Sequence, residues 1–150
     1  MKHIKAKYKL KVRKAHVKDM RFLFNIYNKN VAEGNTFSTV KTNYSDHKKW
    51  FKKVLLKGFI FIGLKNSKIG YVRYDRINKR NFKISIAIKN SFKKKGLGRL
   101  LLKKSLYKLS FDKFNVYAYV NKTNEISKKF FLSCNFKLFK KNIYILKFQK

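Results

Sequence analysis

The sequence predicts a mixed α/β fold, in which helices flank a central β-sheet. Stretches with period-two apolar alternation are interspersed with stretches of helical period, and both kinds occur in each half of the chain. Hydrophobic residues make up 45% of the 150 residues, a proportion typical of globular proteins. A basic loop containing two glycines also separates a strand from an amphipathic helix within residues 84–109. The length fits a single domain over residues 1–150.

The N-terminal half is predicted to form three strands and two helices. Tyr8, Leu10 and Val12 alternate as in a strand, whereas the apolar residues that follow Asp19 recur at helical spacing. Asn66–Lys68 is short enough for a tight hairpin connection. In order, the elements are a strand at Tyr8–Arg13, a helix from Asp19, a loop over Val31–Asn43, a helix capped by Ser45, and strands at Gly58–Lys65 and Ile69–Arg76.

The C-terminal half is predicted to form three further strands and two helices. Ile84, Ile86 and Ile88 alternate with Ser85 and Ala87, as expected of the central strand of a sheet. The predicted elements are a strand at Phe82–Lys89, a helix at Gly98–Leu109, a strand at Phe114–Val120, a helix at Glu125–Ser133 and a strand at Ile143–Phe148. The predicted order along the chain is therefore β-α-α-β-β-β-α-β-α-β.

The net charge of +34 suggests a polyanionic partner. Lys and Arg number 40 against 6 Asp and Glu, an excess that attracts nucleic acids and other anions. Only six of the 40 are arginine, the residue favoured for bidentate phosphate and base contacts, and the lysines are scattered along the chain. We therefore treat a non-enzymatic nucleic-acid-binding protein as an alternative function, and do not expect nucleic acid to be the primary partner.

The apolar runs and the single cysteine indicate where the protein is located. The longest apolar run, Gly58–Leu64, is far too short to span a membrane, and no apolar segment follows the basic N-terminus as in a secretory signal. Cys134 has no second cysteine with which to form an intramolecular disulfide, and we expect it to be a small buried hydrophobe. These features predict a cytoplasmic protein without a membrane span.

The loop before the long helix has the properties of a phosphate-binding site. Gly96 and Gly98 allow the backbone to approach a phosphate closely, and the first amides of the following helix lack intrahelical partners. Four cations accompany these two glycines. The expected phosphate-binding residues are Lys93, Lys94, Lys95, Gly96, Leu97, Gly98 and Arg99.

Two segments resemble the signatures of the GCN5-related N-acetyltransferases. The spacing Lys93-x-x-Gly96-x-Gly98 is similar to the acetyl-CoA loop of that family, and VNKTNEISKKFFLSCNF at 120–136 is similar to its later signature. The resemblance implies a mixed, mostly antiparallel sheet flanked by helices, and acetyl-CoA as acyl donor without a metal ion. It also implies that the donor contacts Ile86, Ala87, Ile88, Asn124, Ser127 and Phe131 as well as the loop.

Two further segments resemble the amino-sugar N-acetyltransferases of pseudaminic and legionaminic acid synthesis. They are NYSDHKKWF at 43–51 and KIGYVRYD at 68–75. This resemblance implies transfer to the 4-amino group of a nucleotide-linked amino-dideoxy sugar, bound by His47, Trp50, Arg73 and Asp75. A protein N-terminus or lysine is the alternative acceptor for the same fold and cofactor. We also consider a homodimer.

Few side chains are suited to move the protons that acetyl transfer requires. His47 has an ordinary pKa near 6.5, which suits a general base, and Glu33 is a comparable candidate. In many relatives a tyrosine stands at the position of Phe131 and protonates the leaving thiolate, which phenylalanine cannot do. Either the acid is Tyr119, Tyr117, Tyr144 or water, or the thiolate leaves unprotonated. We expect direct transfer, because Cys134 has no evident base partner.

Overall fold

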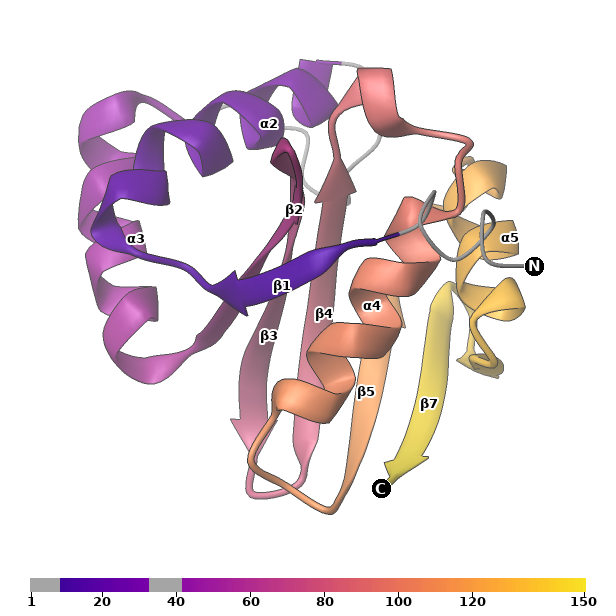
Figure 1. Ribbon diagram of the computed structural model, residues 1–150. Helices are drawn as coiled ribbons and strands as arrows, with labels where there is room; N and C mark the ends of the chain where they lie inside the picture. The colour runs from indigo at the N-terminus through magenta and orange to yellow at the C-terminus, as the bar shows by residue number, and fades with distance from the viewer. Residues whose placement is uncertain (1–8, 33–41) are drawn as a thin grey trace.

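A computed structural model describes residues 9–32 and 42–150 of the chain, in which seven strands form one sheet with the order β1-β2-β3-β4-β5-β7-β6 (Figure 1). The strands are β1 (Lys11–Lys14), β2 (Phe59–Lys65), β3 (Ser67–Asn78), β4 (Asn81–Ile88), β5 (Lys113–Tyr119), β6 (Lys137–Lys140) and β7 (Ile143–Gln149). The α-helices are α2 (Met20–Ala32), α3 (Tyr44–Lys57), α4 (Leu97–Lys108) and α5 (Glu125–Ser133), and short 3-10 turns lie at Val17–Asp19 and Asn90–Phe92. The structure confirms the predicted mixed, mostly antiparallel fold.

The parallel pair of strands at the centre of the sheet is short. All other neighbouring strands are antiparallel, but β4 and β5 run parallel, because α4 crosses over between them. Their register covers only Asn81–Lys83 on β4 and Asn115–Tyr117 on β5. Within the described residues, the remainder of β4 therefore has a neighbouring strand on one side only. The two central strands part at this point and leave an opening in the sheet.

The two faces of the sheet carry separate hydrophobic clusters. One cluster joins α4 and α5 to inward side chains of the central strands, among them Val72, Tyr74 and Val116. The other joins α2 and α3 to the opposite face, which includes Ile62 and Tyr71. Since neighbouring residues of a strand point to opposite faces, β3 contributes to both clusters. Figure 1 shows α4 lying across the central strands, with α2 and α3 together at one side.

The ends of several elements differ from the predicted ones. Asn43, rather than Ser45, caps α3, because its side-chain oxygen accepts a hydrogen bond of 2.8 Å from the main-chain N–H of Asp46. The strand β6 was not predicted, since its four residues are all exposed and lack an apolar alternation. Asn135 follows the C-cap of α5 and has a φ of 68°, in the left-handed region. Asparagine adopts this conformation more readily than most residues, so it suits the end of a helix.

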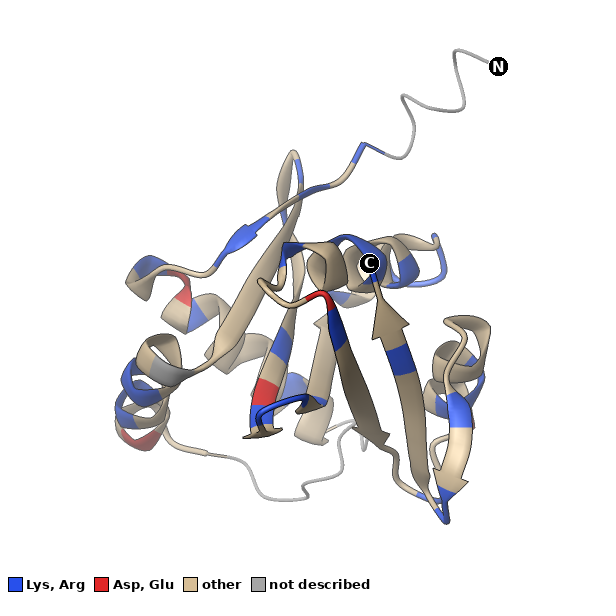
Figure 2. Ribbon diagram, turned by 90° about the horizontal axis from the view of Figure 1, so that it is seen from below, with Lys and Arg blue, Asp and Glu red and all other residues tan. Residues whose placement is uncertain are grey.

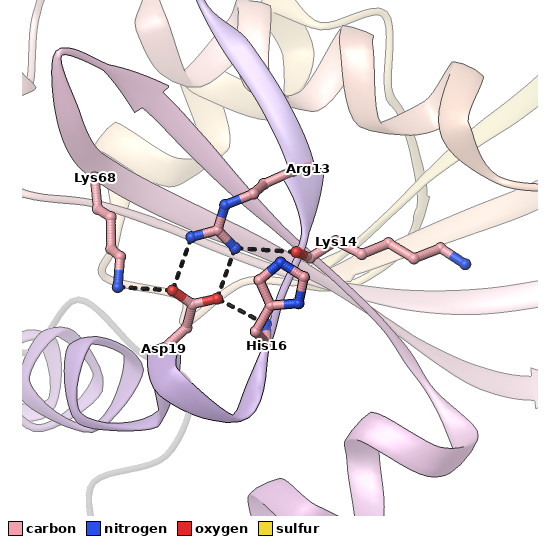
Figure 3. Close-up of polar contacts among 5 residues, drawn as sticks. All are labelled: Arg13, Lys14, His16, Asp19 and Lys68. Carbon is pink, nitrogen blue, oxygen red and sulfur yellow. Dashed lines mark hydrogen bonds and ion pairs between the residues drawn. The ribbon is translucent and has the colours of Figure 1, made fainter.

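Asp19, the last residue of the 3-10 turn before α2, is a buried anion. Its carboxylate is 1% exposed and forms ion pairs of 2.7 Å with both Arg13 and Lys68 (Figure 3). It also accepts a hydrogen bond of 2.7 Å from the main-chain N–H of His16. Burial by itself would raise the pKa of the Asp19 carboxyl, but these donors outweigh burial and hold the pKa well below its ordinary range. The cluster fastens the start of α2 to β1 and to the beginning of β3.

Positive charge is distributed over the whole described part of the molecule. Figure 2 shows Lys and Arg on helices, strands and turns alike, whereas Asp and Glu occur at a few separate places. This distribution agrees with a charge excess that comes from the composition of the chain, because no single basic arm carries it. In the described residues, no helix is both long and apolar enough to cross a membrane.

Candidate active site

The opening between β4 and β5 exposes main-chain amides of the central strand. The N–H of Lys89 donates a hydrogen bond of 2.8 Å to the carbonyl of Ile69, on the β3 side of the ladder. Hydrogen bonds alternate along an antiparallel strand, so the amides of Ile86 and Ile88 point away from β3 and toward the opening, whereas that of Ala87 points toward β3. Such amides can polarise a carbonyl oxygen placed in the opening.

The predicted phosphate-binding loop lies between β4 and α4. Gly96 is the N-cap of α4 and has a φ of 75°, in the left-handed region, and Lys94 is also left-handed with a φ of 61°. A Cβ atom added at Gly96 would have no described atom within 4 Å, so open space lies next to the start of the helix. The amides of Leu97, Gly98 and Arg99 begin this helix and lack intrahelical partners. A phosphate group fits this arrangement of glycine, amides and lysines.

Helix α5 closes the other side of the loop. A Cβ atom at Gly98 would lie 3.3 Å from the ring of Phe130, which shows how closely the two helices approach. Asn124 caps α5 by accepting a hydrogen bond of 3.1 Å from the N–H of Ser127. Phe131 is 6% exposed, and its ring packs edge-on against Phe130 and Phe136. Phe131 therefore belongs to the hydrophobic cluster beneath α4, with no polar group to donate a proton.

A pocket with a volume of about 320 Å³ opens on the opposite face of the sheet, between α2, α3 and β3. Its walls are mostly aromatic or polar, with one acid and one arginine. The lining residues are Leu23, Tyr27, Thr42, Asp46, His47, Trp50, Tyr71 and Arg73. Because Tyr71 and Arg73 pair in register with Ala87 and Ser85 of β4, the pocket lies directly beside the strand with the exposed amides. The sequence singled out only three of these residues, His47, Trp50 and Arg73.

His47 lines the pocket and is held in one orientation. Its side chain is 3% exposed and packs against the rings of Phe24, Trp50 and Phe51. Nε2 lies 3.2 Å from the carbonyl oxygen of Met20, which can only accept, so Nε2 carries the proton of the neutral ring. Burial lowers the pKa of His47, against the effect of the Met20 carbonyl. His47 is therefore a neutral imidazole near pH 7, with Nδ1 as its hydrogen-bond acceptor.

Arg73 is fixed at the edge of the pocket by three neighbours. Its Nε donates to the Asp75 carboxylate at 3.0 Å, and a terminal nitrogen donates to the Ser85 hydroxyl at 3.2 Å. The guanidinium carbon also lies 4.8 Å from the centre of the Trp50 ring, in a cation–π contact. Arg73 and Asp75 lie two residues apart on the same face of β3, where they form an ion pair beside the pocket.

The other predicted residues have different surroundings. Tyr119 lies at the end of β5, and the ammonium of Lys83 stands 4.6 Å from the centre of its ring. Cys134 is buried, as predicted, and burial raises the pKa of its thiol, which opposes a role as nucleophile. Glu33 lies outside the described residues. Within the described part of the chain, no three His, Cys, Asp or Glu residues come together as metal ligands would.

Comparisons with known proteins agree with this architecture. A model of the acetyltransferase (GNAT) family matches residues 20–136. No curated protein matches the chain. Among solved structures, a phosphinothricin acetyltransferase from Sinorhizobium meliloti in complex with acetyl-CoA has a TM-score of 0.79 and 18% identity, over 93% of this chain and 89% of that one.

Two further solved structures share the fold. An N-acetyltransferase from Staphylococcus aureus has a TM-score of 0.72 and 20% identity, and the alignment covers 93% of this chain and 98% of that one. A spermidine N-acetyltransferase variant from Vibrio cholerae has a TM-score of 0.72 and 19% identity, over 92% and 93% of the two chains. At these identities, the likeness concerns the fold and not the acceptor.

Proposed function

Because the chain belongs to the acetyltransferase (GNAT) family, we propose that it transfers the acetyl group of acetyl-CoA directly to the 4-amino group of a nucleotide-linked amino-dideoxy sugar. The observation that carries the proposal is the parting of β4 and β5 beyond Lys83, with a phosphate-binding loop on one side and a polar pocket on the other. The fold thus provides places for a donor and an acceptor that meet at the same strand.

The loop fits the diphosphate of the donor. The left-handed Gly96, the free amides of Leu97 and Gly98 and the nearby lysines would hold this group, and Ile86 and Ile88 would donate to the acyl carbonyl. Acetyl-CoA supplies an acetyl group activated as a thioester. The protein's contribution is to bind it, to polarise the carbonyl and to orient the acceptor amine.

His47 is the base that the pocket best supports. The amine must be neutral to react, and Nδ1 of the neutral His47 ring can accept the proton that it loses. Tyr119 is the proposed proton donor for the leaving thiolate, because Phe131 has no hydroxyl and Tyr119 lies at the end of β5 beside the opening. The buried thiol of Cys134 has no part in this direct transfer.

The polar pocket supports an acceptor that carries oxygen and negative charge. Arg73 has limited freedom and presents donors suited to a phosphate or carboxylate. A volume of about 320 Å³ suits a single sugar ring, and the nucleotide would extend outward over a surface of strong positive potential. The resemblance of segments 43–51 and 68–75 to amino-sugar enzymes points to the same class.

Mass spectrometry of the product tests the proposal directly. The protein is incubated with acetyl-CoA and, in separate reactions, with UDP-4-amino-dideoxy sugars and with peptides that have free N-termini. We expect a sugar nucleotide heavier by one acetyl group. Acetylated peptide instead would keep the fold and donor and replace the acceptor. No product, together with salt-sensitive binding of RNA or DNA, would favour the nucleic-acid alternative.

The substitution His47→Gln is expected to lower kcat at least tenfold and to leave the Kd for acetyl-CoA within about twofold, because His47 lines the acceptor pocket and not the loop. In the wild type, kcat should fall on the acid side as His47 becomes protonated, at a pH below its ordinary pKa of about 6.5. In His47→Gln, kcat should not show this fall at acid pH. His16→Gln, at an exposed position, is the control. Normal turnover of His47→Gln both above and below the pH of this fall would exclude His47 as the base.

A further inference from the structure

We propose that the hydroxyl of Tyr71 forms a hydrogen bond with an oxygen of the acceptor, and that this contact makes the pocket selective for oxygen-bearing amines over aliphatic polyamines. The inference rests on the proposed function, since it concerns the acceptor of the same pocket. Tyr71 was not among the site residues that the sequence indicated, because its alternation on β3 resembles that of an ordinary core residue.

The hydroxyl of Tyr71 lies at the pocket without a partner among the described residues. The residue is 4% exposed and packs in the cluster beneath α2 and α3, which fixes the ring. No fully buried side-chain oxygen or nitrogen in the described chain lacks a hydrogen-bond partner. The unpaired hydroxyl must therefore open onto the pocket that Tyr71 lines. It is a polar group ready to bind a ligand at the end of an immobile ring.

Tyr74 provides a comparison on the same strand, because its hydroxyl is paired inside the protein. It lies three residues along the same strand, on the opposite face, and its hydroxyl is 2.6 Å from that of Ser105. Both tyrosines are almost completely buried, yet of the two only Tyr74 has its hydroxyl paired with another described residue. The contrast indicates that the hydroxyl of Tyr71 is available to a ligand in the pocket that it lines.

The surroundings of Tyr71 keep its hydroxyl protonated, as a hydrogen-bond donor, and they disfavour a cationic ligand. Burial raises the pKa of Tyr71, against the effect of the Arg73 charge, so the hydroxyl keeps its proton. Arg73 lies on the same side of the pocket, His47 is neutral, and Asp46 is an exposed carboxylate that already accepts from the Asn43 amide at 2.8 Å. A polyamine has no oxygen that could accept a hydrogen bond from the Tyr71 phenol. It also carries several positive charges, which a protein of net charge +34 repels.

Equilibrium binding measured by calorimetry tests this selectivity without requiring turnover. The probes are UDP-4-amino-4,6-dideoxy-N-acetylglucosamine and spermidine, and the proteins are the wild type, Tyr71→Phe and Tyr74→Phe. We expect the wild type to bind the sugar nucleotide at least tenfold more tightly than spermidine. Tyr71→Phe should bind the sugar nucleotide about tenfold more weakly, which corresponds to the loss of one hydrogen bond, and Tyr74→Phe should bind it as the wild type does.

Four results would contradict the proposed role of Tyr71 in acceptor selectivity. An unchanged Kd for Tyr71→Phe, equal effects of both substitutions, or spermidine bound as tightly as the sugar nucleotide would overturn the inference, as would a wild type that binds neither probe. The proposed function fails separately: if the sugar nucleotide binds through Tyr71 but gains no acetyl group, the transfer reaction is wrong and the recognition stands. If the sugar nucleotide is acetylated but its Kd does not change in Tyr71→Phe, the transfer reaction stands and the role of Tyr71 in recognition is wrong.

Discussion

The substitution Gly96→Glu is expected to weaken acetyl-CoA binding about 100-fold or more, with little change in the fold. Gly96 has a φ of 75°, a conformation that costs other residues about 1–2 kcal/mol. The new side chain would project into the open space beside the first amides of α4, where the diphosphate is proposed to bind. Its carboxylate would compete for those amides and repel the phosphates. Calorimetric titration with acetyl-CoA gives the Kd, and circular dichroism monitors folding.

Lys108→Glu is the matched control for the effect of charge. Lys108 is the exposed last residue of α4, at the end of the helix away from the loop. Its replacement changes the net charge by two units, against one unit for Gly96→Glu, so a general electrostatic effect would be larger in the control. We expect the control to bind acetyl-CoA within about threefold of the wild type at moderate salt. Unchanged binding by Gly96→Glu would refute the assignment of the loop.

The substitution Asp19→Asn is expected to lower the free energy of unfolding by about 3 kcal/mol. The amide cannot serve as the anion for Arg13 and Lys68, and it can lose one of the hydrogen bonds made by the buried carboxylate. The cluster also joins β1, the start of α2 and the beginning of β3, so that its loss loosens three elements together. Urea denaturation at neutral pH measures the change. A loss under about 1 kcal/mol would show that the cluster contributes little.

The pH dependence separates this charge effect from a change in packing. The folded-state pKa of Asp19 is held below its unfolded value of about 3.9, so the stabilisation is fully present above that value and is lost as the pH falls below it. The stability difference between wild type and Asp19→Asn should therefore shrink below about pH 4. Glu125→Gln removes the same charge from an exposed pair with Lys128 and should cost less than about 1 kcal/mol.

The sequence predicted the geometry of the loop before α4 better than it predicted the pocket between α2, α3 and β3. The loop is a local feature, because glycine conformation, helix start and nearby lysines all come from residues 93–99. The pocket instead combines residues from α2, α3 and β3, which are far apart in sequence. The sequence predicts Tyr71 and Tyr74 equally as strand residues. Only the packing of the helices decides that the hydroxyl of Tyr74 is paired and that the hydroxyl of Tyr71 faces the pocket.

Apolar periodicity and turn residues determined most of the secondary structure. Helix α5 and the strands β2 to β5 and β7 lie within two residues of their predicted ends, since each buries a regular apolar face. The exposed β6 has no such face, and its pairing with β7 is a tertiary property. Ser and Asn are equally good caps, so residue type does not distinguish Ser45 from Asn43 at the start of α3, and the backbone geometry favours Asn43.

By itself, the sequence determined the fold class, the order of the elements other than β6, the loop that begins α4 and the excess of positive charge, because local residue type governs all four. Only the tertiary structure decided where β4 and β5 part, which amides face the opening, and that Asp19 is a buried anion between Arg13 and Lys68. It also decided the state of His47, whose tautomer follows from the carbonyl of Met20. These properties depend on contacts between distant segments, which a linear pattern of residues does not specify.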